Sequence, residues 1–477
     1  MSESRSARAK TWQLVLFSFN DSATNMIMML MAFVSYLYTG AIGTSVIFIS
    51  TFLTGMRVWD AVTDPIIGWI IDHTGGRFGK FRPMICIGYF LMLLSLLQMF
   101  FGAPRASENA KFVLFVASYV VYVIGYTFQT ACTKAGQTCM TIDQDQRPII
   151  SRASSIVNMG VFTGVPMYTS MYLAPKYGGF TVAAMQEFCI TALLISGVLT
   201  VCAVTALWTR DVPENWGVDK KQNIKVKDCL DIVVHNHPLQ LLIASAASDK
   251  IATLVSTNSS VLIMLFGIIM GDYALNGSIS MITIIPNIIF IILGTQLAKK
   301  QGFRKIMSVF SLLDIILYAL LGVMVMTVQP GTISLQSMNF ATIAFLVLYC
   351  LSSGTKNVSC NMAVPMIADC TDYEVVRSGH YAPGIIGTIF SFVDKVISSL
   401  STTIVGLFMV AIGYSNTLPQ PTDALTPGVR TSTLLCFVIL PIIGWMINII
   451  SMKFYKLDEK TMEKIHDRLV EIKAKNE

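Results

Sequence analysis

The sequence contains 477 residues, of which 54% are hydrophobic and 13% are charged, and its formal net charge is +6. An ordinary soluble domain has roughly 25% charged residues, so this composition excludes a chain whose only solvent is water. The excess positive charge has a simple explanation in membrane topology, and we expect no nucleic acid partner.

Apolar stretches of about 18 residues or more recur from about Trp12 to Tyr455, and each is long enough to cross a bilayer core of roughly 30 Å. The first stretch follows a polar, basic arm and lacks a small-residue cleavage site, so we interpret it as a retained span. The pattern predicts an all-α membrane protein with about 12 transmembrane helices in two six-helix bundles. We expect spans near residues 13–38, 46–72, 84–103, 111–141, 151–173, 186–208, 238–268, 274–298, 305–327, 338–369, 384–414 and 430–454.

The charged stretch between the sixth and seventh predicted spans separates two halves. We expect an N-terminal bundle over 1–208, a cytoplasmic linker over 209–237, a C-terminal bundle over 238–454 and a cytoplasmic tail over 455–477. Of the 34 Lys and Arg residues, 25 fall in the segments that this arrangement places inside, and four fall in outer loops. This positive-inside bias predicts a multi-pass protein of the cell (inner) membrane with both termini cytoplasmic.

Charged side chains also lie inside the predicted spans. Burying a charge at a helix centre costs ~2.5–3.5 kcal/mol on insertion scales, so such residues usually face a partner or a wet cavity. They indicate a transport pathway, although some could instead lie near span ends and reach the interface. The basic ones are Arg57, Lys134, Lys250, Lys356 and Lys395, and the acidic ones are Asp21, Asp60, Asp64, Asp249, Asp314 and Asp394.

The segment RVWDAVTDP gives the sharpest chemical signal. Asp60 and Asp64 are four residues apart, so they lie on one helix face, one turn from each other. Two ionised carboxylates repel each other, and a bound sodium ion or a shared proton relieves that repulsion. The spacing therefore predicts a cation site. Alternatively, Arg57 neutralises one carboxylate in a structural ion pair.

Five motifs occur in order along the chain: FNDSATNM, RVWDAVTDP followed by GRFGKFRP, MIADCTDYE, FVDKVISSLS and FYKLDEKTMEKI. Together they resemble the glycoside–pentoside–hexuronide:cation symporter family, the melibiose permease-like group of the major facilitator superfamily. The resemblance covers nearly the whole chain. It implies the major facilitator superfamily fold, a sugar-type solute in a central cavity, no cofactor, and a proton or sodium as the coupling ion.

The resemblance also assigns residues. Asp60 and Asp64 match the cation-site aspartates, Lys395 matches the lysine of helix 11, and Arg152 resembles the arginine at the start of helix 5. Asn25, or its neighbour Thr24, falls where the family has a sugar-binding aspartate. The chain departs from the family in helix 4, where Thr130 replaces an acidic sugar- and cation-binding residue and Lys134 replaces a sugar-stacking tryptophan.

The two halves echo each other at this departure. ACTKAGQTCM in helix 4 resembles SGTKNVSCNM in helix 10, and FNDSATN in helix 1 resembles ASDKIAT in helix 7. These helices occupy equivalent places in the pseudo-symmetric superfamily fold, so we expect Lys134 and Lys356 to face the cavity from opposite sides. The predicted substrate-binding residues are Asp21, Asn25, Thr130, Lys134, Arg152, Lys356 and Lys395.

Cavity lysines with few carboxylates nearby would attract an anion, such as a uronide or a phosphorylated sugar. Two alternatives stay open: Lys134 pairs with a neighbouring aspartate, or the solute is a non-sugar organic anion or a lysolipid-like amphiphile. The five histidines lie in loops or at span ends, so the sequence does not favour an enzyme. We expect a monomer in the lipid bilayer that transports a small anionic molecule by alternating access.

Overall fold

The computed structural model describes residues 9–141, 146–213, 234–378, 383–458, 461–465 and 467–468. Within these ranges every regular element is a helix, which confirms the predicted all-α class. The chain divides into two compact units. The first contains Met1–Lys220 and Tyr414–Gln420, and the second contains Lys221–Gly413 and Pro421–Glu477.

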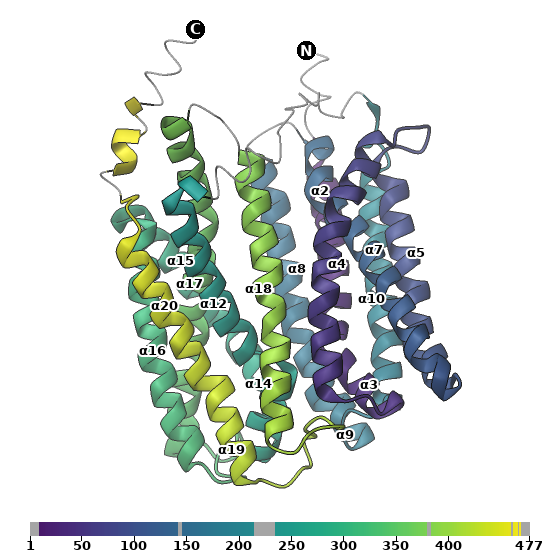
Figure 1. Ribbon diagram of the computed structural model, residues 1–477, viewed down its shortest axis with the longest axis vertical. Coiled ribbons are helices and arrows are strands. Elements are labelled where there is room, and N and C mark those ends of the chain that lie inside the picture. Colours follow the sequence, from purple (N-terminus) through teal and green to yellow (C-terminus); the bar gives the residue numbers. More distant parts are fainter. Residues whose placement is uncertain are drawn as a thin grey trace. The chain divides into compact units, whose positions relative to one another are not determined.

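The first unit is built from long helices that run side by side (Figure 1). Short π-helical turns at Gln98–Gly102 and Tyr168–Leu173 extend two of them. The helices are α2 (Thr11–Met31), α3 (Val34–Ile42), α4 (Val46–His73), α5 (Phe81–Leu97), α6 (Ala103–Arg105), α7 (Glu108–Met140), α8 (Arg147–Met167), α9 (Ala174–Tyr177) and α10 (Val182–Leu207).

The second unit contains a comparable set, with π-helical turns at Ile263–Ile269 and Leu435–Ile439. One hydrophobic segment is bent by 111° between Ser259–Ile269 and Ala274–Ile282. The helices are α12 (His237–Ser256), α13 (Ser259–Leu262), α14 (Ala274–Ile282), α15 (Ile284–Gln301), α16 (Phe303–Thr327), α17 (Phe340–Ser378), α18 (Pro383–Ala411), α19 (Pro427–Leu434) and α20 (Leu440–Phe454).

Within the described residues, ten helices are long and apolar enough to cross a membrane, or eleven if the bent pair counts as one span. The sequence predicts about 12, and two positions account for the difference. The predicted span 151–173 corresponds to α8, where Ser151, Ser154, Ser155 and Asn158 lower the hydropathy. The predicted span 274–298 is divided between α14 and α15. In the first place polar residues interrupt the apolar pattern, and in the second a break at Thr283 divides the apolar segment into two short helices.

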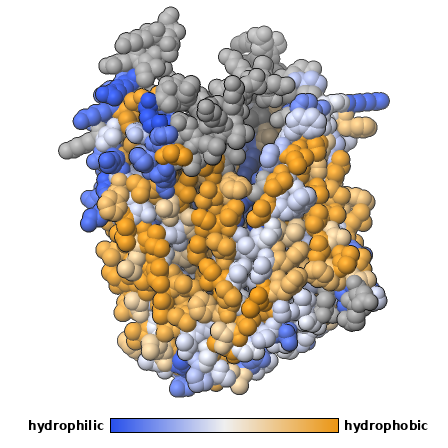
Figure 2. All heavy atoms as spheres, in the orientation of Figure 1, coloured by the Kyte–Doolittle hydropathy of each residue, from blue (hydrophilic) through white to orange (hydrophobic). Residues whose placement is uncertain are grey.

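Apolar side chains are exposed along the helices, as expected for a surface that contacts lipid tails. On α10, Leu194, Val198 and Val201 are each more than 60% exposed and lie three or four residues apart, on one face. Figure 2 shows hydrophobic residues over the middle of the visible helices and hydrophilic residues near their ends. Water would not stabilise such a surface, so the chain is a multi-pass membrane protein.

A carboxylate fixes the start of α5. Asp211 accepts hydrogen bonds from the backbone N–H groups of Lys80 (2.9 Å), Phe81 (2.8 Å) and Arg82 (2.8 Å). These are first-turn donors that the helix itself cannot satisfy, and a negative charge there is favoured by the helix dipole. Gly79 has φ +90°, and a Cβ atom at this position would overlap the Asp211 carboxylate. The glycine of the GKFRP motif is therefore required by both conformation and space.

The segment Tyr414–Gln420, between α18 and α19, packs with the first unit. The Tyr36 hydroxyl donates to Pro419 O (3.1 Å), and the Phe180 N–H donates to Gln420 Oε1 (2.8 Å). The N–H of Val46, the first residue of α4, donates to Ser415 O (2.9 Å). These bonds satisfy backbone groups of the connecting segments and the first N–H of α4, where an unpaired group is costly.

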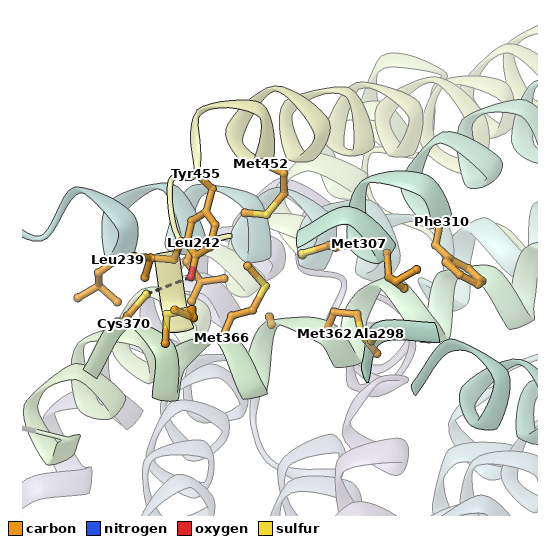
Figure 3. Packing of buried hydrophobic residues seen from close by; sticks show 14 of the residues in the cluster. Leu239, Leu242, Ala298, Met307, Phe310, Met362, Met366, Cys370, Met452 and Tyr455 are labelled. Carbon is orange, nitrogen blue, oxygen red and sulfur yellow. Dashed lines mark hydrogen bonds between the residues drawn. The ribbon is translucent and has the colours of Figure 1, made fainter. Parts of the chain in front are cut away.

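A methionine-rich core joins α12, α16, α17 and α20 in the second unit (Figure 3). Met307 and Met366 are at most 1% exposed, and the buried Tyr455 hydroxyl lies 3.6 Å from Cys370 Sγ. Methionine fills irregular gaps between helices because its side chain is flexible and polarisable. About two helical turns from Leu242 and Met307, the same helices carry the buried acids Asp249 and Asp314.

Candidate functional site

A polar cavity of about 360 Å³ lies among α2, α7 and α8 of the first unit. Its volume falls within the roughly 300–1,000 Å³ that is usual for small-molecule sites. Hydroxyl and amide groups dominate the lining, with one acid and one lysine among them. The lining residues are Phe17, Ser18, Asp21, Thr133, Lys134, Gln137, Ile150, Ser151, Ser154, Ser155 and Asn158.

The acid of this cavity is held by neutral donors from α8. Asp21 Oδ2 accepts hydrogen bonds from Ser154 Oγ (2.5 Å) and Asn158 Nδ2 (2.7 Å). The amide of Asn158 also accepts from Ser22 Oγ (2.7 Å), so α2 and α8 are joined by a small polar network. This network explains why α8 is less apolar than its neighbours. It also compensates the Asp21 carboxylate without a cation.

Lys134 lies in the same cavity and is exposed to it. In the part of the chain that the structure describes, its ammonium group has neither a hydrogen bond nor an ion pair within 4.0 Å. The sequence had left open an internal pair between Lys134 and a nearby aspartate. Here the aspartate that shares the cavity, Asp21, is bonded to Ser154 and Asn158. The ammonium group is therefore available to a molecule that enters the cavity.

The predicted cation site lies on α4, against α7. Asp60 is 2% exposed, and Thr127 Oγ1 donates a hydrogen bond to Asp60 Oδ1 at 3.0 Å. Arg57 Nη1 is 4.0 Å from Asp60 Oδ2, and its side chain is 44% exposed. At 4.0 Å the two charged groups lie at the outer limit of an ion pair and make no direct hydrogen bond. Asp64, one turn further along α4, is half-buried.

Thr127 is a site residue that the sequence did not single out. The family pattern points to Thr130, whose hydroxyl donates within its own helix, to Tyr126 O (3.1 Å) and Thr127 O (3.2 Å). Thr127 lies three residues earlier on α7, and its hydroxyl contacts the Asp60 carboxylate. The i, i+3 spacing of the two threonines was the available signal, because it puts them on neighbouring parts of one face.

The structure brings some predicted substrate residues together and leaves others apart. Asp21 and Lys134 line the cavity, whereas Asn25, Thr130 and Arg152 are outside its lining. Asn25 is half-buried on α2, one turn after Asp21, and Arg152 is exposed on α8 beside the lining residues. Their roles stay predictions.

The predicted residues of the second unit lie on two helices. Lys356 is half-buried on α17, and within the described residues it makes no hydrogen bond or ion pair. Lys395 is half-buried on α18. Next to it on α18, Asp394 forms an ion pair with Lys250 of α12 (3.8 Å). Among the described residues, no group of three or more His, Cys, Asp or Glu is arranged to hold a metal ion.

Residues 16–459 match the family model described as MFS/sugar transport protein. The chain belongs to this family. Members similar to it include the isoprimeverose transporter of Lactiplantibacillus pentosus, 24% identical over 93% of this chain and 88% of the relative. The glucuronide carrier protein homolog of Escherichia coli (strain K12) is 22% identical over 95% of this chain and 94% of the relative. The family resemblance found in the motifs is thereby confirmed.

Among solved structures, the nucleoside transporter NupG superposes with a TM-score of 0.62 at 13% identity. The match covers 94% of this chain and 100% of that chain. At this identity the likeness concerns the fold alone, and it confirms the predicted major facilitator superfamily fold.

Proposed function

We propose that the protein is a secondary active transporter that moves an acidic sugar or glycoside across the membrane together with a cation. One observation carries this proposal: within the described residues, Lys134 has no ionic partner in a polar cavity whose acid, Asp21, is already bonded to neutral groups. An unpaired ammonium group gains an opposite charge when an anionic ligand enters the cavity and displaces the water around it.

The rest of the cavity suits a sugar. Thr133, Gln137, Ser151 and Ser155 offer hydroxyl and amide groups that can bond to ring hydroxyls, beside a single ammonium group that can bond to a carboxylate. The names of relatives include both a transporter of isoprimeverose and a glucuronide carrier homolog, so kinship supports a sugar but leaves its charge open. The lysine is the reason for choosing the acidic class.

Coupling is assigned to Asp60 and Asp64, with Thr127 as a hydroxyl partner of Asp60. We propose the proton as the coupling ion. Sodium prefers several oxygen ligands, and Thr130 stands where the family has an additional carboxylate, so this chain offers fewer anionic oxygens. A sodium-dependent increase in solute affinity at constant pH would reverse this choice.

We propose transport by alternating access, which the family fold supports. Solute and cation each stabilise the occluded form, so neither crosses efficiently alone, and the coupling between them is reciprocal. The positive-inside bias supports a cell (inner) membrane protein with both termini in the cytoplasm, and we propose that it acts as a monomer. Labelling of a cysteine introduced at Lys456 by a membrane-impermeant reagent tests the orientation: intact cells should protect it.

The central test replaces Lys134 with Gln and measures equilibrium binding of D-glucuronate and of its neutral amide. The acidic ligand should lose roughly 1.5–3 kcal/mol, the value of a charge-assisted hydrogen bond, while the amide loses much less. Lys134→Arg should rescue only in part, because the planar guanidinium places its donors differently. Lys356→Gln should behave like Lys134→Gln. The control is Lys300→Gln, an exposed lysine near the end of α15, which should change neither ligand.

Equal losses for the two ligands would contradict an anionic solute and would give Lys134 a role in folding. Uptake by proteoliposomes across matched acidic and neutral sugars then identifies the transported class.

A further inference from the structure

Asp249 and Asp314 are buried carboxylates of the second unit that belong to neither of the sites above, and a third, Glu374, is paired with Arg377. Asp249 on α12 is 1% exposed, and Asp314 on α16 is 0% exposed. Within the described residues neither forms a salt bridge. A carboxylate removed from water must be compensated by hydrogen bonds or by a cation, or else it takes up a proton.

Asp249 is compensated by hydrogen bonds. Its Oδ1 atom accepts from Trp445 Nε1 (2.9 Å) and from Ser359 Oγ (3.1 Å). Ser359 Oγ also lies 3.0 Å from Ser311 Oγ. The proton of Ser359 is used on Asp249, so Ser311 donates to Ser359 and extends the chain of bonds to α16.

Asp314 is different. Its Oδ2 atom is buried and has no hydrogen-bond partner among the described residues, and its Oδ1 atom contacts one group, Thr355 Oγ1. The Thr355 hydroxyl also lies 3.0 Å from Leu351 O and 3.2 Å from Ser352 O. One hydroxyl proton therefore faces three acceptors, and an ionised Asp314 would compete with the backbone carbonyls for it.

A proton on Asp314 resolves this competition. With Oδ1 protonated, the acid donates to Thr355 Oγ1, and the threonine donates to Leu351 O. The protonated form makes one more hydrogen bond than the ionised form and buries no net charge. The unpartnered Oδ2 atom then belongs to a neutral carbonyl, for which burial is far less costly than for an anion.

Three titratable groups act on Asp314. Asp249 of α12 and Lys356 of α17 interact with it electrostatically, and Tyr318 of α16 is a further neighbour. Lys356 follows Thr355 directly in the sequence and interacts with both carboxylates. Its ammonium group opposes protonation of Asp314, whereas Asp249 favours it.

We propose that Asp314 is a proton-binding site in the second unit, separate from Asp60 and Asp64, with Thr355 Oγ1 as the hydrogen-bond acceptor of the protonated acid and Lys356, the next residue, as a charge that opposes protonation. An anion bound at Lys356 would neutralise the ammonium group and favour protonation of Asp314. That link to the solute rests on the proposed function, whereas the proton site itself does not.

Infrared difference spectroscopy on the purified full-length protein tests the site without any solute. The wild type should show the carbonyl band of a buried protonated carboxylic acid near neutral pH, and Asp314→Asn should lose it. The control Glu463→Gln removes an exposed carboxyl group outside the spans and should keep the band. Thr355→Val should keep the band but shift its frequency, because the hydrogen-bond acceptor is gone.

Lys356→Gln should keep the band to higher pH, because the ammonium group that opposes protonation is gone, and Lys356→Arg should restore the wild-type range. An unchanged band in Asp314→Asn would overturn the assignment, as would an unchanged frequency in Thr355→Val. If Asp314→Asn fails to fold, the Thr355 and Lys356 variants still decide, since neither removes the acid. A positive result here with no binding of acidic sugars would refute the proposed solute while leaving the proton site in place.

Discussion

Replacing Thr127 with Val distinguishes proton coupling from sodium coupling, because the affinity for the cation should rise if it is a proton and fall if it is sodium. Thr127 Oγ1 lies 3.0 Å from both Asp60 Oδ1 and Val123 O, and the ionised carboxylate is the stronger acceptor; because Asp60 is 2% exposed, solvent cannot replace the lost bond. A hydrogen bond to a charged group is worth roughly 1.5–3 kcal/mol, which corresponds to about one to two pH units. Arg57 Nη1, 4.0 Å from Asp60 Oδ2, is present with and without the Thr127 hydroxyl, so it does not alter the comparison.

If the cation is a proton, the hydroxyl stabilises the empty, charged carboxylate. Its removal should then tighten proton binding and move the pH dependence of uptake upward by that amount. If the cation is sodium, the hydroxyl oxygen is a ligand, and its loss should weaken sodium binding. The assay is uptake into proteoliposomes, as a pH titration without sodium and as a sodium titration at fixed pH. Thr205→Val, an exposed hydroxyl bonded within α10, is the control. No change in either titration would refute the role of the Thr127–Asp60 contact.

Two further predictions follow from the carboxylates of the first unit. Asp60→Asn and Asp64→Asn should each abolish concentrative uptake but leave downhill exchange, because the amide keeps the shape and loses the charge; full accumulation by both variants would exclude the cation site. Asp211→Ala should destabilise the protein by roughly 3 kcal/mol or more in thermal unfolding, since it strands three backbone donors at the start of α5. Gly79→Ala should act through the same site, while Asp272→Ala, which removes one exposed cap, should cost less.

The sequence predicts the helical membrane fold well because the bilayer permits few alternatives. Each span must satisfy its own backbone hydrogen bonds, so length and hydropathy alone locate most helices. Length and hydropathy fail to locate a span where the helix carries polar side chains that make contacts inside the protein. The α8 segment is the clearest case: Ser154 and Asn158 lower its hydropathy because they bind Asp21. The residues that make this span hard to recognise from hydropathy are also residues that line the cavity.

Residue contacts are harder to predict than helices. The sequence could place Asp60 and Asp64 on one face, since that depends on spacing within a single helix. It could not show that Thr127 rather than Thr130 contacts Asp60, because the rotation of α7 against α4 is set by packing along their whole lengths. A sequence motif identifies the helix and the helical turn on which a site residue lies, whereas tertiary packing determines which side chain contacts Asp60.

The similar motifs in the two halves show that one sequence pattern can place an aspartate in two different environments. Asp21 and Asp249 occupy matching motifs, yet Asp21 borders a polar cavity while Asp249 is 1% exposed. The difference comes from the neighbouring helices. In the first unit α8 brings small hydroxyl and amide groups that leave space, whereas in the second unit Trp445 of α20 bonds to Asp249 and fills the volume. Matching sequences in a pseudo-symmetric fold therefore predict matching positions but not matching access to water.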